Sequence, residues 1–298
     1  MQPQWDDLRI FLAVARLESL SAAGRVLKID PATVGRRITR LEEALRAPLF
    51  ARSPQGYALT GEGQRLMGHA ARAEQEMTAA FEDLSGQGAQ LSGQIRLGSP
   101  DGSANFLLPQ VCAQIVEQNP DLEVQIVALP RVFNLSRREA DMAIAVSAPL
   151  AGRLSVQKVT DYRLSLVASR DYLRNSAPIN SVEDLRDHRI VGYIQDMIFD
   201  KELDYMAEAG LPRVDLASNS VSVQFSWIRQ GAGIGIVHDF SIPFGQGLVR
   251  VLPHEVSLTR SFYLIRHVDD RRLDRLNRFA EALAAGMRRE VARLEGQG

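Results

Sequence analysis

The first part of the chain repeats apolar side chains with the period of an α-helix. In the segment Trp5–Glu18 they recur at i, i+3, i+4 and i+7, which predicts an amphipathic helix with one face in the core. These positions are Leu8, Phe11, Leu12 and Ala15. The hydroxyl groups of Ser19 and Ser21 can cap the next segment, Ala22–Leu27. Its small residues predict a short helix that packs closely on its neighbours.

A third helix is predicted from Pro31 to about Leu45. The proline disfavours the α region at Asp30 and suits the first helical position, so Asp30 is predicted to be the N-cap. The stripe predicted to face inward comprises Val34, Ile38, Leu41 and Leu45. The opposite face carries Thr33, Arg36, Arg37 and Arg40. This helix is therefore predicted to bury one side and to present arginines on the other.

A small β-hairpin, or wing, is predicted after this helix. Leu49–Ala51 and Tyr57–Leu59 flank Ser53–Gly56, where proline in second place and glycine in fourth suit a type I turn. Thr60 can cap a long helix that extends to Gln87 and measures about 40 Å at ~1.5 Å per residue. Along it runs a seam with heptad spacing, made of Leu66, Ala70, Ala73, Met77, Ala80 and Leu84. This regularity favours self-association over packing on the protein's own surface.

Strands and helices alternate in the remainder of the chain. The stretch Ser85–Gly93 that precedes them is rich in Gly, Gln and Ser, a composition typical of a linker or hinge. The predicted strands are Ile95–Leu97, Leu122–Val127, Met142–Val146, Arg163–Ala168, Arg189–Gly192, Val214–Ala217, Ile234–Val237 and Phe262–Ile265. The predicted helices include Phe106–Glu117, Val132–Glu139 and Arg271–Leu294. This alternation predicts α/β layers, with ligands in the crevice beyond the strand ends.

The length of 298 residues predicts two or three domains, because one hydrophobic core rarely serves so long a chain. Hydrophobic residues make up 45% of the sequence, yet no apolar run is long enough to cross a bilayer. Met1–Ile10 carries no signal segment, so we expect a soluble, cytoplasmic protein with no membrane partner. The single cysteine, Cys112, excludes an internal disulfide and a thiolate metal cluster made by one chain. Its expected role is that of a small buried hydrophobe.

The net charge of -1 does not indicate a nucleic-acid partner, but the charges are unevenly distributed. Residues 25–52 hold seven basic and three acidic side chains, a local excess of four positive charges. The order of short helix, turn, arginine-bearing helix and wing is the arrangement that presents a helix to the major groove of DNA. Guanidinium groups bond phosphates or guanine, and a helix N-terminus offers N–H groups to an anion. A solvated arginine face on an ordinary helix is the alternative interpretation.

Three motifs in residues 8–59 and just beyond follow the pattern of a known family in order. They are LRIFLAVARLESLSAAGRVL, ATVGRRITRLEEAL and PLFARSPQGYALTGEG, the last of which contains a Leu-Thr-x-x-Gly start to the long helix. This segment resembles the DNA-binding module of LysR-type transcription regulators, and such a combination of motifs is specific. The resemblance implies an all-α winged helix-turn-helix domain over residues 1–60. It also implies a linker and dimerisation helix with hinge over 61–92, and an α/β effector-binding domain over 93–298.

The resemblance implies DNA contacts from the second helix, the third helix and the wing. The residues concerned are Ser21, Ala22, Pro31, Thr33, Arg36, Arg37, Arg40 and Arg52. Two positions depart from the family's pattern, because Pro31 stands where many members have Gln and Gly35 where they usually have Ser. We therefore expect base recognition to depend on Thr33, Arg36 and DNA shape more than is usual.

The larger C-terminal part resembles the LysR effector domain, a pair of Rossmann-like subdomains like those of periplasmic binding proteins. The motifs GQIRLGSPDGSANFLLPQV, READMAIAV and VSVQFSWIRQGAGIGIV carry this resemblance. It implies a pocket lined by Ser99, Pro100, Asp101, Arg131, Ser147, Tyr193, Ile194 and Val221. Such loops favour small carboxylates, but Asp101 argues against a simple anion or for a ligand with a hydroxyl or amine. Each of these residues can instead be a loop or packing residue.

The resemblance also implies the partners of the protein. They are double-stranded promoter or operator DNA, a small-molecule effector, a second copy bound through the linker helix, two further copies in a homotetramer, and RNA polymerase as a further candidate. Two-fold symmetry in a homodimer would place two recognition helices on two half-sites of the DNA. No cofactor, metal or catalytic residue is expected.

An α/β enzyme or a solute-binding protein with an appended oligomerisation segment is the alternative, supported only by the alternation of strands and helices. The run Gly231–Gly235 follows a helix and enters a strand, the reverse of a dinucleotide-binding fingerprint. Ser99 does not lie in a Gly-x-Ser-x-Gly elbow, and the five histidines lack the spacing of a metal site. His238, just beyond a strand, could face the cleft, although a surface or core position is favoured.

Overall fold

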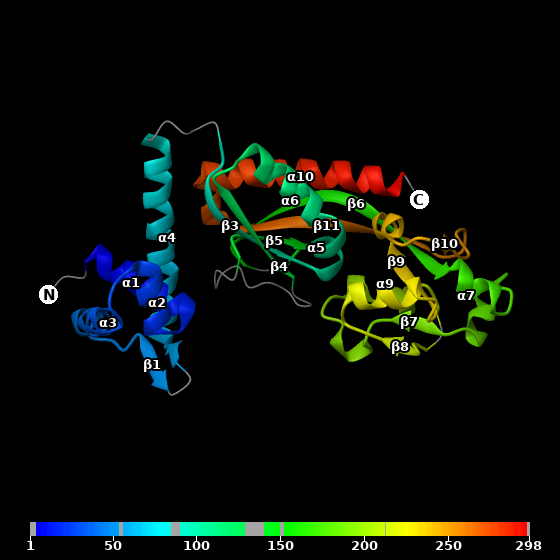
Figure 1. Ribbon diagram of the computed structural model, residues 1–298, viewed down its shortest axis with the longest axis horizontal. Helices are drawn as coiled ribbons and strands as arrows, with labels where there is room; N and C mark the ends of the chain where they lie inside the picture. The colour runs from blue at the N-terminus through cyan, green and yellow to red at the C-terminus, as the bar shows by residue number, and fades with distance from the viewer. Residues whose placement is uncertain are drawn as a thin grey trace. The chain divides into compact units, whose positions relative to one another are not determined.

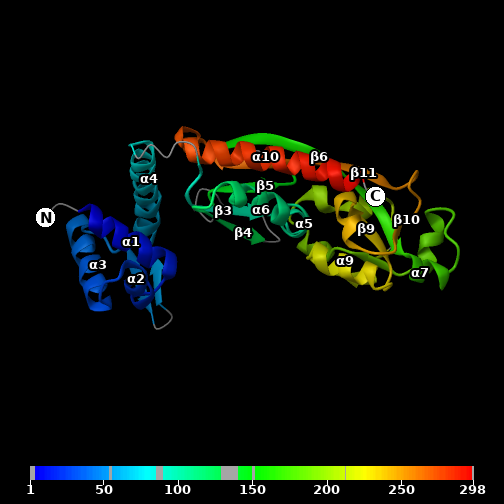
Figure 2. The ribbon, with the colours of Figure 1, turned by 45° about the horizontal axis from the view of Figure 1, so that its top comes forward.

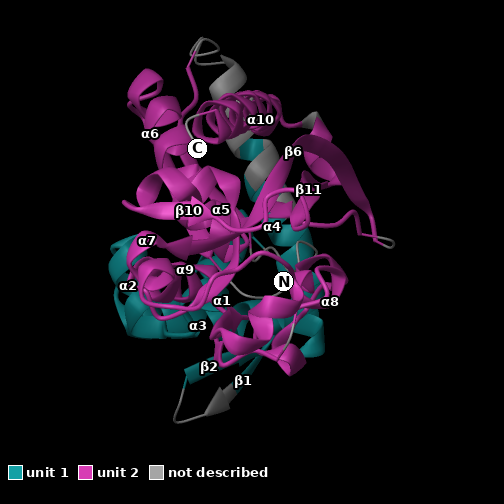
Figure 3. Cartoon of the chain, turned by 90° about the vertical axis from the view of Figure 1, so that its right-hand side faces the viewer, with its two compact units in different colours: residues 1–89, 136–138 teal, residues 90–135, 139–298 magenta. Residues whose placement is uncertain are grey.

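The computed structural model describes residues 4–53, 56–84, 90–128, 140–149, 152–211 and 213–296. These residues form two compact units, the first ending at residue 84 and the second beginning at residue 90 (Figures 1 and 3). Each unit buries large apolar side chains of its own. No helix in the described ranges combines the length and the apolar character that crossing a membrane requires.

The first unit contains the predicted helices and the predicted wing. Its elements are α1 (Trp5–Leu17), α2 (Leu20–Leu27), α3 (Pro31–Leu45), β1 (Phe50–Ser53), β2 (Gly56–Leu59) and α4 (Gly61–Leu84). The predicted cap of α3 is confirmed, because the Asp30 carboxylate accepts the N–H groups of Ala32 and Thr33 at 2.9 and 3.1 Å. Helix α2 is capped in the same way by the Ser19 hydroxyl, which accepts the Ala22 N–H at 3.3 Å. Short polar side chains before each helix therefore set where α2 and α3 begin.

The core of the first unit forms where the apolar stripes of α1 and α3 meet. Its fully buried members include Phe11, Leu12, Val34, Ile38 and Leu41. The inward prediction is wrong for Leu45, whose side chain is 37% exposed. Leu45 is the last residue of α3, and the chain leaves the helix at Arg46 in a left-handed conformation with φ 54°. The chain re-enters the core only at Leu49.

The wing is anchored to α3 by a glutamate. Strands β1 and β2 pair in antiparallel fashion, with Phe50 opposite Leu59, and the predicted turn residues 54 and 55 lie outside the described residues. The Glu42 carboxylate accepts the N–H groups of Leu49 and Phe50 at 2.8 and 3.2 Å. Since these donors stand where the chain enters β1, Glu42 fixes the start of the wing against α3.

Glu42→Ala is expected to destabilise the first unit by about 1–3 kcal/mol, because two backbone N–H groups lose their acceptor. Glu43→Ala is the matched control, since Glu43 is the exposed neighbour on the same helix. The free energy of unfolding is measured by urea titration of a Trp227→Phe background, in which Trp5 of α1 is the remaining tryptophan. Equal losses in the two variants would contradict the anchoring role of Glu42.

Helix α4 packs against α1 over its first half. Ala70 and Ala71 are buried in the core of the first unit, and Leu66 packs against that core. The first two positions of the predicted seam therefore pack within the first unit itself. Met77, further along the seam, is 38% exposed, whereas the side chains of residues 80 and 84 lie outside the described part.

The second unit is built on one mixed sheet. Its described strands are β3 (Gly93–Ser99), β4 (Leu122–Ala128), β5 (Met142–Ala145), β6 (Leu154–Ser169), β7 (Ile190–Gly192), β8 (Leu216–Ala217), β9 (Ile234–His238), β10 (Leu248–Arg250) and β11 (Ser257–His267). Their order across the sheet is β4-β3-β5-β11-β6-β9-β7-β8, with β10 paired to β6. The predicted strand 163–168 is thus only the end of a 16-residue strand, and β10 was not predicted.

Two long antiparallel strands join two lobes of this unit (Figure 2). The first half of β6 pairs with one end of β11, and the same end of β11 also pairs with β5. Residues Leu164–Val167, in the second half of β6, pair with β9. We call lobe 1 the part built on β3, β4 and β5, and lobe 2 the part built on β7, β8 and β9. The predicted α/β fold class with two subdomains is confirmed, and the crossing strands β6 and β11 are the connection that periodicity did not predict.

Helices cover both lobes. They are α5 (Asp101–Phe106), α6 (Leu108–Gln118), α7 (Arg170–Arg174), α8 (Tyr205–Glu208), α9 (Val221–Arg229) and α10 (Asp274–Glu295), with 3-10 turns η2 (Glu183–Asp187), η3 (Gln195–Met197), η4 (Lys201–Leu203), η5 (Asp239–Phe244) and η6 (Val268–Arg272). The predicted helix 106–117 corresponds to α6, which begins two residues later, after the backbone at Leu107 with φ -119°. Helix α5, which ends at Phe106, was not predicted. The predicted helix 132–139 lies outside the described residues.

Helix α10 buries the face that its spacing predicts. The buried positions include Leu276, Phe279, Leu283, Met287 and Val291. This helix packs against α6 of lobe 1, where Cys112 is also buried. Burial raises the pKa of the Cys112 thiol to about 12, so the side chain stays protonated, in accord with its predicted role as a small hydrophobe.

Candidate functional site

The outer face of α3 presents an exposed arginine. Arg36 Nη2 donates to Thr33 Oγ1 at 2.9 Å, so the two side chains form one polar group on successive turns. Within the described ranges, Arg36 forms no ion pair with an acidic side chain. Pro31, at the first position of the same helix, is also exposed. The guanidinium of Arg36 is therefore available to an external acceptor.

Two other arginines of α3 are drawn against α1 by a buried carboxylate. Arg37 Nη1 lies 3.1 Å from Asp7 Oδ1, and Arg40 Nη2 lies 2.5 and 2.7 Å from the two Asp7 oxygens. The Asp7 side chain is 3% exposed, and a carboxylate so buried needs charged partners. Arg37 and Arg40 remain about one third exposed, so they hold α3 to α1 and still contribute positive potential at its surface.

The other predicted DNA contacts lie at the start of α2 and in the wing. Ser21 is exposed and Ala22 is half-buried in the first turn of α2. Arg52 belongs to β1, where its backbone pairs with Tyr57, but its side chain lies outside the described part. At the start of α3 the Asp30 carboxylate already bonds two backbone N–H groups, so the predicted anion site at that helix end is occupied by the chain itself.

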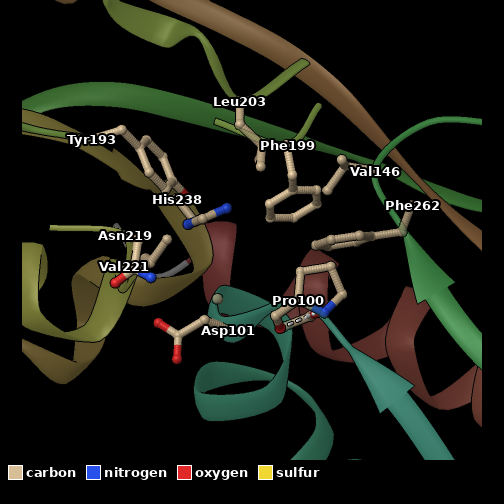
Figure 4. Close-up of a pocket in the computed structure, with 12 residues that line it drawn as sticks. Pro100, Asp101, Val146, Tyr193, Phe199, Leu203, Asn219, Val221, His238 and Phe262 are labelled. Carbon is tan, nitrogen blue, oxygen red and sulfur yellow. Dashed lines mark hydrogen bonds between the residues drawn. The ribbon is translucent and has the colours of Figure 1, made fainter. Parts of the chain in front are cut away.

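The second unit contains a pocket between its lobes, enclosing about 350 Å³ of space including its solvent-open part (Figure 4). The described residues that line it are Pro100, Asp101, Gly102, Ser103, Val146, Tyr193, Phe199, Leu203, Asn219, Val221, His238 and Phe262. Most of the lining is apolar or aromatic.

The pocket includes four of the eight residues proposed for it by resemblance, namely Pro100, Asp101, Tyr193 and Val221. Ser99 is fully buried and hydrogen-bonds Ser103 Oγ at 2.7 Å, so it supports the pocket from behind. Ser147 donates to the Asp200 carboxylate, and neither Ser147 nor Ile194 is among the described lining residues. Arg131 lies outside the described residues.

Sequence reasoning missed several lining side chains. Phe199 and Leu203 come from the irregular stretch between β7 and β8, where no periodic pattern marks a function. Asn219 stands just before the cap of α9, and the start of that helix could have indicated it, because pockets in α/β folds form at strand ends and helix starts. His238, the last residue of β9, lines the pocket, the position that the sequence offered as the less favoured alternative.

A carboxylate ties the two lobes together at the pocket. Asp101 Oδ2 accepts hydrogen bonds from Ser220 Oγ at 3.0 Å, from the Ser222 N–H at 2.9 Å and from Ser222 Oγ at 3.1 Å. Asp101 begins α5 of lobe 1, whereas the serines stand at the start of α9 in lobe 2. The positive end of α9 therefore faces a negative charge supplied by the opposite lobe.

His238 is the buried imidazole of the pocket. Its side chain packs on Gly102, where an added Cβ would lie 2.7 Å from the imidazole Cε1, and its ring stacks on Phe240 at 4.8 Å between centroids. Burial lowers the pKa of His238 to about 4, although the Asp101 charge opposes that effect. The imidazole is therefore neutral at pH 7, and its Nδ1 has no hydrogen-bond partner among the described residues.

Two sequence families match the chain. The family described as "Bacterial regulatory helix-turn-helix protein, lysR family" matches residues 5–64, and "LysR substrate binding domain" matches residues 88–288. The first match contains the α3 surface with Arg36, and the second contains the whole pocket.

Individual relatives agree with these matches. The chain is 26% identical to the HTH-type transcriptional regulator PtxR of Pseudomonas aeruginosa over 256 residues, which are 83% of this chain and 81% of PtxR. It is 28% identical to the HTH-type transcriptional activator TtdR of Escherichia coli over 258 residues, 84% of this chain and 83% of TtdR. A full-length OxyR variant from Pseudomonas aeruginosa shares the fold with a TM-score of 0.72 and 16% identity, over 96% of this chain and 98% of OxyR.

Proposed function

Since the chain belongs to the LysR family of bacterial transcriptional regulators, we propose that it binds promoter DNA through the exposed face of α3 and responds to a small molecule in the pocket between its lobes. The observation that carries the DNA-binding surface is the exposed Arg36 and Thr33 pair. We propose that residues 1–60 form the DNA-binding domain, 61–92 the linker helix and hinge, and 93–298 the effector-binding domain.

The residues of α3 divide into two roles in this proposal. Arg36 and Thr33 contact base edges, because guanidinium and hydroxyl groups find hydrogen-bond partners in the major groove. Arg37 and Arg40 position α3 through Asp7 and lie near DNA phosphates, which set orientation rather than sequence. The flanking contacts come from Ser21, Ala22, Pro31 and Arg52.

The assembly is also a proposal. The long α4, with Met77 exposed in its second half, joins two copies into a homodimer that places two α3 helices on two half-sites, and two dimers form a homotetramer. RNA polymerase is a further partner at the promoter. The protein acts in the cytoplasm, where its DNA lies, and it acts as a regulator rather than as an enzyme. PtxR is named as a transcriptional regulator and TtdR as a transcriptional activator.

The position of the pocket between the two lobes allows a bound ligand to control the arrangement of the lobes. A small molecule between Asp101 of lobe 1 and α9 of lobe 2 contacts both lobes at once, so it favours whichever lobe arrangement those contacts fit best. That preference changes how the first units of the two copies in a dimer are placed on the DNA, which couples ligand binding to promoter binding.

Arg36→Ala is expected to weaken binding to DNA from upstream of the protein's own gene by about 1–3 kcal/mol, a factor of about 5 to 150. Arg186→Ala is the matched control, since it removes the same charge from an exposed position of the second unit. Affinity is measured by fluorescence anisotropy of labelled DNA with excess competitor. Retained affinity would remove Arg36 from the contact surface, and absence of specific, salt-sensitive binding by the unaltered chain would overturn the proposed function.

A further inference from the structure

We propose that the pocket between the lobes binds an uncharged aromatic molecule bearing a hydroxyl group, and that the Asp101 carboxylate occupies the position at α9 which a ligand carboxylate would otherwise take. This inference rests on the proposed function and deepens it by naming the chemical class of the effector. Its support comes from the hydrogen bonds of Asp101, the charges of the lining, the shape of the wall and an unpartnered nitrogen of His238.

The start of α9 is the part of the pocket best suited to an anion, because backbone N–H groups and hydroxyls converge there. Three of its donors are the Ser222 N–H, the Ser222 hydroxyl and the Ser220 hydroxyl. All three already donate to Asp101 Oδ2. A carboxylate on the ligand would find these donors in use and a like charge beside it.

The lining offers a ligand anion no positive charge. Among the twelve described residues that line the pocket, none is lysine or arginine. His238 is neutral near pH 7, since burial lowers its pKa to about 4. A carboxylate buried there without a cation and next to Asp101 would be strongly disfavoured, whereas an uncharged ligand loses little hydration.

The remaining wall suits a flat apolar ring. Tyr193 and Val221 lie on one side of the pocket and Phe199 and Phe262 on the other (Figure 4). Aromatic rings pack against such walls through stacked or edge contacts as well as by burial of apolar area. The wall therefore favours an aromatic ligand over an extended polar one.

The polar group of the ligand is specified by His238. Its imidazole lies between Tyr193 and Phe199 in the close-up, is 4% exposed, and leaves Nδ1 without a partner among the described residues (Figure 4). A neutral imidazole has one donor and one acceptor nitrogen, and a hydroxyl can bond to either. A ligand hydroxyl at Nδ1 would remove the cost of leaving this buried polar atom unpaired.

The test is calorimetric titration of the full chain with three probes of similar size: 4-methylphenol, toluene and 4-methylbenzoate. We expect 4-methylphenol to bind about tenfold more tightly than either of the others, because only it supplies a hydroxyl without a charge. Equal or tighter binding of 4-methylbenzoate would overturn the exclusion of acids. Equal binding of toluene would overturn the role of His238, and no binding by any probe at millimolar concentration would overturn the proposal as a whole.

Two variants test the role of His238 and the role of Asp101 separately. His238→Phe should remove the preference for 4-methylphenol over toluene, and its far-ultraviolet circular dichroism shows whether the fold is kept. Asp101→Asn should raise the affinity for 4-methylbenzoate about tenfold, because it removes the competing charge. This gain of binding cannot come from misfolding, and its absence would contradict the stated role of Asp101.

DNA binding by the same preparations separates this inference from the function on which it rests. Specific DNA binding together with a preference for 4-methylbenzoate would overturn only the ligand class. A preference for 4-methylphenol without specific DNA binding would overturn the proposed function and leave the ligand chemistry standing.

Discussion

Gly63→Ala is expected to destabilise the first unit by about 3 kcal/mol, because the first turn of α4 runs against the backbone of the segment before the wing. A Cβ at Gly63 would lie 2.1 Å from the Leu49 carbonyl oxygen and 2.9 Å from Leu59 Cδ2. The Leu49 carbonyl cannot move away freely, since it accepts the Thr60 N–H at 3.0 Å. This contact explains the glycine of the Leu-Thr-x-x-Gly motif: α4 can begin here only where that position lacks a side chain.

Gly61→Ala is the matched control for this substitution. Gly61 lies two residues earlier in the same turn, and an added Cβ there meets no atom within 4 Å. Alanine at this position should therefore leave stability unchanged or raise it slightly. Urea unfolding of both variants, followed by Trp5 fluorescence in the Trp227→Phe background, makes the comparison. Similar midpoints for Gly63→Ala and Gly61→Ala would show that the close contact has no energetic consequence.

Acid is expected to destabilise the second unit through His238. The pKa of this imidazole is lowered from 6.5 to about 4 by burial, and Asp101 is the charged group that faces it. The unfolded chain therefore takes up the proton at higher pH than the folded chain. The contribution to stability is complete above pH 6.5 and is lost as the pH falls toward 4, and the difference in pKa corresponds to about 3 kcal/mol.

The measurement is urea unfolding between pH 7.5 and pH 4.5, followed by Trp227 of α9 in a Trp5→Phe background. His238→Phe should flatten the pH dependence of the unfolding free energy relative to that background, because the titrating group is gone. His254→Gln is the control, since His254 is exposed, and it should retain the slope. An unchanged slope in His238→Phe would show that other groups account for the acid sensitivity.

The elements of the first unit were predictable because their signals are local. The Asp30 cap involves backbone N–H groups two and three residues away, and the helical stripe of Phe11 and Ile38 follows from spacing alone. A local pattern does not show which distant segment it will meet. Leu66 and Ala70 have heptad spacing, and in the structure they pack with the core of the first unit, while the predicted self-association of the seam stays a prediction.

The long strand β6 shows a second limit of sequence patterns. Only its second half was predicted, although Leu154–Thr160 also alternates apolar and polar residues with a single break at Gln157 and Lys158. This first part pairs with β11 about a hundred positions away. Pairing of this kind depends on the register with a strand far away in the sequence. The pattern of a short stretch of residues carries no information about that register. The crossing of β6 and β11 between the lobes was therefore visible only in the tertiary structure.

By itself the sequence determined the helix starts, the wing, the alternation of strands and helices and the family, since each depends on residues close together in the chain or on motifs in order. The tertiary structure alone decided which charged groups are free. Asp7 reaches Arg37 and Arg40 across 30 and 33 positions, and Asp101 reaches Ser222 across 121. A charge is neutralised by whatever lies near it in space, and folding, not order along the chain, brings those partners together.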